Sequence, residues 1–156
     1  MSPSSGQDAK GRSAARLACV QALYQMEISA ADANDVIDEF ISYWFDKERR
    51  GSEYAKADVR HFADVVRGVV ANQAEIDKLI DAALADEWAL KRLDNTLRAL
   101  LRAGTYELMG RSEIPARVVF DEYLEIAHAF FEGSEPSFAN GVLDHIARRA
   151  RAPEFS

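Results

Sequence analysis

Apolar residues recur along most of the chain at intervals of three or four, the spacing of an amphipathic α-helix. In the first such segment, about residues 13–29, apolar positions cover more than half of the helical wheel, and Gln21 and Gln25 form a narrow polar strip. A helix so widely apolar is predicted to lie at the centre of the fold. Its regularly spaced apolar positions are Leu17, Val20, Tyr24 and Ile28.

The same period continues in six later segments, and two clear breaks, at 110–115 and 133–136, contain Gly and Pro. No segment alternates apolar and polar residues strongly enough to predict a β-strand. The pattern therefore predicts an all-α fold of about seven helices. The later segments are about 35–50, 57–72, 76–84, 97–109, 118–131 and one that begins near Pro136.

A chain of 156 residues suits one domain or two small, closely packed subdomains. Its net charge of -7 argues against a protein that coats DNA, because duplex binders usually carry a basic surplus. Basic residues do gather locally at Lys10, Arg12 and Arg16. The two arginines are four residues apart and share a face where the first helix begins, although the helix dipole disfavours cations there. They form either a solubilising helix start or contacts for an anionic partner.

Cys19 is the only cysteine, so no disulfide can form within the chain and a reducing compartment is favoured. The first twelve residues contain no apolar run of the kind that a secretory signal requires. No segment is long and apolar enough to span a membrane. The expected location is the cytoplasm.

The sequence lacks the residue patterns typical of catalytic and metal sites. His61, His128 and His145 are far apart, without the spacings that bind zinc. The chain has no glycine-rich phosphate cradle, no dinucleotide-binding fingerprint and no nucleophile elbow. We therefore expect a protein that is not an enzyme and that uses no metal or cofactor.

The pair Asn140-Gly141 is unusual in the predicted last helix. The dipeptide favours tight turns, and glycine inside a helix costs about 1 kcal/mol relative to alanine. The favoured explanation is that Gly141 lets a neighbouring helix approach closely. In the alternative, Phe138 and Asn140 face a ligand, because an aromatic ring and an amide suit stacking on an RNA base and reading its edge.

Several segments, taken together, resemble the NusB family of transcription antitermination factors. They occur in the family's order and spacing from Arg12 to about Ile146, so the resemblance spans nearly the whole chain. The segments are ARLACVQALYQ (15–25), FADVVRGV (62–69), WALKRL (88–93), LLRAGTYEL (100–108), IPARVVFDEYLEIAHAF (114–130) and FANGVLD (138–144).

This resemblance implies a single helical domain over 13–152, with two packed subdomains at about 13–75 and 76–152, after a flexible tail at 1–12. It implies a non-catalytic protein that binds the boxA RNA of ribosomal RNA leaders and phage transcripts. The implied protein partner is NusE, which is also a small-subunit ribosomal protein. The pair is expected to join RNA polymerase in an antitermination complex.

The resemblance also assigns residues to these partners. The family's arginine-rich arm falls on 12–16, where this chain has only two arginines, so we expect weak RNA binding without NusE. Acidic side chains near the fourth and fifth helices would suit a basic ribosomal protein. The implied RNA contacts are Lys10, Arg12, Arg16, Gln21, Tyr24, Phe138 and Asn140, and the partner contacts are Glu87, Asp94 and Glu107.

Two other interpretations stay open. The RNA-binding domain of an rRNA cytosine methyltransferase shares this fold, but such a protein needs a methyl-donor domain with a glycine-rich turn. A homo-oligomeric helical interaction module without RNA fits the acidic balance of the chain, and the free protein could be a homodimer.

Overall fold

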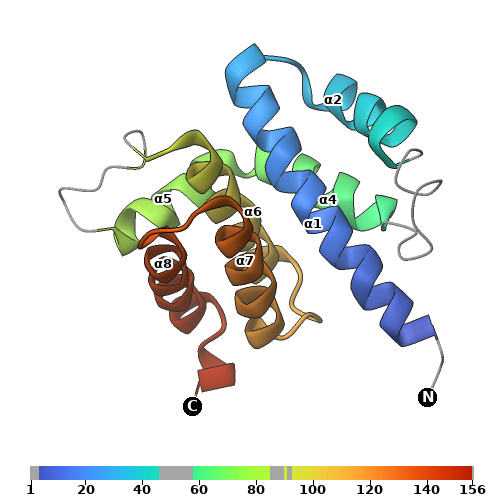
Figure 1. Cartoon of the computed structure of the whole chain (residues 1–156). Coiled ribbons are helices and arrows are strands. Elements are labelled where there is room, and N and C mark those ends of the chain that lie inside the picture. Colours follow the sequence, from blue (N-terminus) through green and yellow to red (C-terminus); the bar gives the residue numbers. More distant parts are fainter. Residues whose placement is uncertain (1–3, 46–57, 85–89, 91–92, 156) are drawn as a thin grey trace. The chain divides into compact units, whose positions relative to one another are not determined.

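The structure, a computed structural model, describes residues 4–45, 58–84, 90 and 93–155 (Figure 1). Within these residues there are seven α-helices and no strand, which confirms the all-α fold. A π-helical segment follows α2 and a 3-10 helix follows α8. The elements are α1 (Ser4–Ser29), α2 (Ala33–Glu39), η1 (Phe40–Phe45), α4 (Val59–Ala71), α5 (Gln73–Ala83), α6 (Asn95–Gly110), α7 (Ala116–Phe130), α8 (Glu135–Ala150) and η3 (Ala152–Phe155).

The chain divides into two compact units, Met1–Arg67 and Gly68–Ser156. The division falls inside α4, earlier than the boundary near residue 75 that the sequence predicted. A boundary inside a continuous helix leaves no Gly- or Pro-rich linker for the sequence to reveal.

The first unit contains α1, α2 and the beginning of α4. Helix α1 begins at Ser4, nine residues before the start at residue 13 that the hydrophobic pattern predicted. The reason lies in tertiary contacts, because Gly11 is buried and its carbonyl accepts a 3.0 Å hydrogen bond from the amide of Asp58. Cys19 of α1 also donates from its thiol to the carbonyl of Phe62, and the ring of Phe62 stacks on Phe40 at 5.6 Å.

The second helix is shorter than expected. Asp32 caps α2 by accepting a 3.0 Å hydrogen bond from the amide of Asn34. After Glu39 the helix widens into the π-helical segment η1 instead of continuing as an α-helix, and the rest of the predicted span to residue 50 lies outside the described residues.

In the second unit, α6, α7 and α8 pack against one another, and α5 contacts α6 and α8 (Figure 1). Gly104 of α6 is buried where these three helices meet. A Cβ atom built on Gly104 would lie 3.0 Å from Cδ2 of Leu143 on α8 and 3.5 Å from Cδ2 of Tyr123 on α7. Close helix packing in this unit therefore depends on Gly104.

Gly141 does not have the packing role that the sequence analysis favoured. It is exposed, and a Cβ built on it meets no described atom within 4 Å. Gly68 does make a close approach, because a Cβ there would lie 2.2 Å from the ring of Tyr106. The expectation for Gly141 is wrong because its position on α8 faces away from the neighbouring helices.

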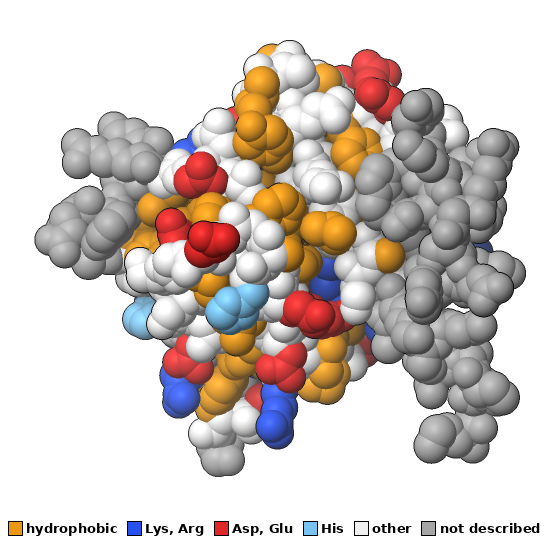
Figure 2. All heavy atoms as spheres, viewed as in Figure 1, with side chains coloured by type: hydrophobic (Ala, Val, Ile, Leu, Met, Phe, Trp, Pro, Cys, Tyr) orange, Lys and Arg blue, Asp and Glu red, His pale blue; other side chains and the backbone are white. Residues whose placement is uncertain are grey.

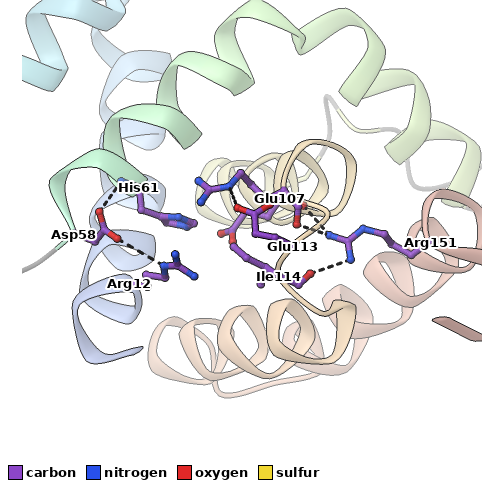
Figure 3. A network of polar contacts seen from close by, with 8 residues as sticks. Arg12, Asp58, His61, Glu107, Glu113, Ile114 and Arg151 are labelled. Carbon is purple, nitrogen blue, oxygen red and sulfur yellow. Dashed lines mark hydrogen bonds and ion pairs between the residues drawn. The ribbon is translucent and has the colours of Figure 1, made fainter. Parts of the chain in front are cut away.

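Arg151 joins the end of α8 to the end of α6. Its guanidinium group is almost completely buried and donates hydrogen bonds to four backbone carbonyl groups, of which Figure 3 labels Glu107 and Ile114. Such bonds satisfy carbonyls that the end of a helix leaves without partners. The acceptors are the carbonyls of Glu107 (3.2 Å), Leu108 (2.7 Å), Arg111 (2.7 Å) and Ile114 (2.9 Å).

Glu154 in η3 extends this arrangement to the start of α7. One carboxylate oxygen accepts a 2.9 Å hydrogen bond from the amide of Ala116, and the other pairs with Arg151 at 2.6 Å. The hydrogen bond from Ala116, followed by that from Arg151, lowers the pKa of Glu154 below its ordinary value. The chain after α8 thus holds the adjoining ends of α6 and α7.

Candidate nucleic-acid interface

The described part of the predicted basic arm is tied to the protein itself. Nε of Arg12 lies 3.6 Å from a carboxylate oxygen of Asp58, and the other oxygen accepts a hydrogen bond from the amide of His61 (Figure 3). The Arg12 side chain is 38% exposed, so this ion pair is only weakly stabilising. An RNA phosphate would have to compete with Asp58 for the guanidinium group.

Arg16 lies in the interior of the protein. It shares a face of α1 with Arg12, as predicted, but it is only 1% exposed. A buried guanidinium group is retained where protein groups compensate its lost hydration. This burial corrects the expectation that Arg16 presents its charge to RNA.

Gln21 and Tyr24 occupy a different face of α1. With about 100° of rotation per residue, position 21 is about 180° from position 12 and about 60° from position 24. Tyr24 is 39% exposed and Gln21 is half-buried. Lys10 lies in α1 within about 20° of Gln21 by the same period, but its side chain lies outside the described set.

Phe138 and Asn140 are both half-buried in the first two turns of α8. Two residues apart on a helix, they point about 160° away from each other. They therefore cannot both contact one base from the same side of the helix. Around the helix axis, the exposed Gly141 lies between these two residues, about 60° from Phe138 and 100° from Asn140.

Of the predicted partner contacts, Asp94 is exposed and also has a structural role. Its carboxylate caps α6 by accepting hydrogen bonds from the amides of Thr96 (2.8 Å) and Leu97 (3.2 Å). One carboxylate oxygen accepts both hydrogen bonds, so the other oxygen stays available to a further donor. Glu87 lies outside the described residues.

Glu107 cannot be a surface contact in this structure. It is fully buried in α6, and its carboxylate accepts a short hydrogen bond from the hydroxyl of Tyr123 on α7. Its backbone carbonyl is one of the acceptors of Arg151. Glu107 therefore holds the helices of the second unit together, which corrects its assignment to a partner interface.

Charge is mixed over the described part of the face shown in Figure 2. In Figure 2, acidic, basic and hydrophobic side chains alternate, and the described part of the face shown carries no broad basic patch. Among the described residues, no group of His, Cys, Asp and Glu could hold a metal ion. None of the described helices has the length and apolar character that crossing a membrane requires.

Some residues of structural importance were not identified from the sequence. The role of Arg151 could not be found in the sequence, because the carbonyl groups it binds are distant along the chain. The helical period of the sequence did indicate which glycine is buried and which is exposed. Gly104 falls in step with Leu97, Leu101 and Leu108, whereas Gly141 falls in step with Ser137, His145 and Arg148.

The chain matches known proteins over nearly its whole length. Residues 13–148 match the model of the NusB family. A relative from Nitrobacter hamburgensis named transcription antitermination protein NusB is 57% identical, and the match covers 95% of this chain and 92% of the relative.

Solved structures show the same fold. The T. maritima NusB structure is 34% identical, with a TM-score of 0.75 over 92% of this chain and 96% of that one. A crystal structure of antitermination factors NusB and NusE in complex with dsRNA contains a chain with a TM-score of 0.74, covering 89% of this chain and 97% of that one, at 22% identity, which shows the fold alone. Because both the family model and a highly identical relative span almost all of it, the chain belongs to the NusB family.

Proposed function

We propose that the protein is a cytoplasmic, non-catalytic transcription antitermination factor. It binds the boxA RNA of ribosomal RNA leaders together with NusE, and the pair joins RNA polymerase in an antitermination complex. The observation that carries this proposal is the family match over 13–148, with a 57% identical relative named for antitermination.

The surface chemistry of the chain supports joint binding with a basic partner. The net charge is -7, and among the described side chains near the start of α1, Arg12 is paired with Asp58 and Arg16 is buried. Phosphate neutralisation supplies much of the affinity of proteins for nucleic acids. A basic ribosomal protein would supply the missing charge, and it would meet acidic residues such as Asp94 favourably.

Tyr24 is the described residue of α1 best suited to contact RNA. A tyrosine that is 39% exposed has a ring face available for stacking on an unpaired base. Gln21 lies one helical turn earlier on a neighbouring part of the surface, where its amide could read a base edge.

The test measures RNA binding by fluorescence anisotropy, with a labelled boxA RNA and a scrambled RNA of equal length, with and without NusE. We expect tight, sequence-dependent binding only for the protein with NusE. Tyr24→Ala should weaken it about 5-fold or more, the usual effect of losing one base–aromatic stack. Phe130→Ala is the matched control, since this aromatic residue on α7 is 41% exposed.

Equal affinity for boxA and scrambled RNA in the presence of NusE would contradict the proposal. Sedimentation of the protein in the same buffer tests the remaining alternative, the homo-oligomeric interaction module. A stable homo-oligomer that binds neither NusE nor RNA would instead support the homo-oligomeric interaction module.

A further inference from the structure

Asp58 lies beside Arg12 because a backbone hydrogen bond joins their two segments. The amide of Asp58 donates to the carbonyl of Gly11 at 3.0 Å, and Gly11 directly precedes Arg12 in the chain. The pair therefore lies within the first unit, between α1 and the start of α4 (Figure 3). The Asp58 carboxylate is also fixed, since it caps α4 by accepting a 2.9 Å hydrogen bond from the amide of His61.

The contact between Arg12 and Asp58 is one that an anion can displace. Nε of Arg12 lies 3.6 Å from the carboxylate oxygen, which is an ion-pair distance and too long for a hydrogen bond. Both side chains are partly exposed, so water competes with the pair and it holds Arg12 only weakly. Because Asp58 is anchored by its backbone and by the cap, a change of partner would move the long side chain of Arg12.

Arg12 matters for the charge that α1 presents to an anion. Among the described side chains of α1, it is the only cation that is not buried, since Arg16 lies in the interior. A carboxylate beside this cation cancels its charge and repels any phosphate that approaches it.

We propose that Asp58 competes with RNA for Arg12 and thereby lowers the affinity of the protein for phosphate. RNA binding replaces the carboxylate of Asp58 with a backbone phosphate on the guanidinium group. The inference rests on the proposed function, because it concerns the regulation of the same RNA binding, and it adds a residue that opposes binding. Weak phosphate binding leaves the choice of RNA to base contacts and to NusE, because phosphates carry no sequence information.

The charge of Asp58 can be separated from its role as a helix cap. Asparagine caps a helix about as well as aspartate, and serine does so too. Asp58→Asn and Asp58→Ser should therefore both fold and melt within about 3 °C of the wild type. Each removes the carboxylate charge, so both should show the same change in RNA binding, which excludes an effect of one particular side chain.

The test measures fluorescence anisotropy of labelled boxA RNA with NusE present. We expect Asp58→Asn to bind about 2- to 5-fold more tightly than the wild type at low salt, the usual worth of one exposed ion pair. The log–log slope of affinity against salt should steepen by up to about 0.7, because one further phosphate is neutralised. A scrambled RNA of equal length should gain by the same factor, whereas a gain confined to boxA would overturn the assignment to phosphate.

Two controls connect the gain to Arg12. Asp32→Asn removes the same charge from an exposed aspartate that caps α2 in the same unit, and it should leave RNA affinity near that of the wild type. In the background of Arg12→Gln, the change Asp58→Asn should give no gain, because the cation that it releases is absent.

The remaining outcomes separate this inference from the proposed function. Wild-type RNA affinity of the folded Asp58→Asn and Asp58→Ser proteins would overturn the inference alone. A gain that persists in Arg12→Gln, or that Asp32→Asn matches, would show a general effect of net charge and would overturn it too. Absence of boxA binding by the wild type with NusE would overturn the proposed function and this inference with it.

Discussion

Leu143 of α8 lies directly over Gly104 of α6, with its Cδ2 atom 3.0 Å from the place of a Cβ on residue 104. Both residues are buried, so the larger side chain of Gly104→Val would have to displace Leu143 or separate the two helices. We expect a loss of about 1–3 kcal/mol in the free energy of unfolding, measured in urea. Gly141→Val is the same change in open space and should alter stability by less than about 0.5 kcal/mol. Equal effects of the two variants would contradict this account of the packing.

Arg151→Met should be among the most destabilising single changes in the second unit. It removes one donor from each of four backbone carbonyls at the end of α6 and in the following turn. The carbonyls of Glu107 and Arg111 keep a backbone amide as donor, whereas those of Leu108 and Ile114 lose the donor that Arg151 supplies. Orphaned buried polar groups cost about 1–3 kcal/mol each, so two of them predict a total loss of at least about 2 kcal/mol.

The control for Arg151 is Arg148→Met in the last turn of the same helix. Arg148 has an exposed pair with Asp144, so its loss should cost no more than about 1 kcal/mol. Chemical denaturation of the two variants side by side gives the comparison. Similar stabilities for both would mean that the contacts of Arg151 contribute little.

The helices could be predicted because their apolar period is strong in each segment, as in Val65, Val66 and Val69 of α4. The start of α1 could not be predicted, since the hydrogen bond between the amide of Asp58 and the carbonyl of Gly11 joins residues that only the fold brings together. For the same reason an isolated sequence gives no sign that the charge of Arg16 is buried.

The candidate site was harder to predict than the helices. Glu107 is in phase with the buried Leu100 and Ala103, so the helical period already placed it inside, although its charge suggested the surface. Its partner, the hydroxyl of Tyr123, comes from another helix and cannot be found by local pattern. The family resemblance, together with the charge of the side chain, therefore misassigned Glu107, and its position in the helical period would have corrected the assignment.

Glu154 gives the protein a specific dependence on pH. Its pKa is lowered in the folded state, by the hydrogen bond from Ala116 and then by Arg151. Its stabilising contribution is therefore complete above the ordinary pKa of a glutamate, about 4.3, and is lost as the pH falls through the lower folded value. Glu154→Gln should lower the melting temperature at pH 7, and this difference from the wild type should shrink below about pH 4.3. A difference that stays constant from pH 7 to acid would exclude this linkage.

Ala30 ends α1 with a left-handed backbone, at a φ of 56°. Its amide donates a 2.8 Å hydrogen bond to the carbonyl of Met26, a geometry typical of a helix end that favours glycine. Glycine removes the steric cost of a Cβ atom in the left-handed conformation, about 1–2 kcal/mol. This gain exceeds the cost of the greater conformational entropy that glycine gives the unfolded chain, about 0.4–1 kcal/mol. Ala30→Gly should therefore raise the free energy of unfolding by up to about 1 kcal/mol. Ala31→Gly, at a position whose φ is not positive, should lower it, and the opposite order in urea unfolding would contradict the prediction.

Asp94 caps α6 and is also a proposed contact for NusE, and two substitutions distinguish these roles. Asparagine caps a helix about as well as aspartate, so Asp94→Asn should keep the hydrogen bonds to the amides of Thr96 and Leu97 and preserve stability. Asp94→Ala loses the cap and should cost about 1 kcal/mol. If Asp94 also meets a basic NusE, both variants should bind NusE more weakly by a similar factor, and the loss should diminish at high salt. Calorimetric titration of NusE into each variant measures this. Wild-type affinity for Asp94→Asn would leave Asp94 with its capping role only.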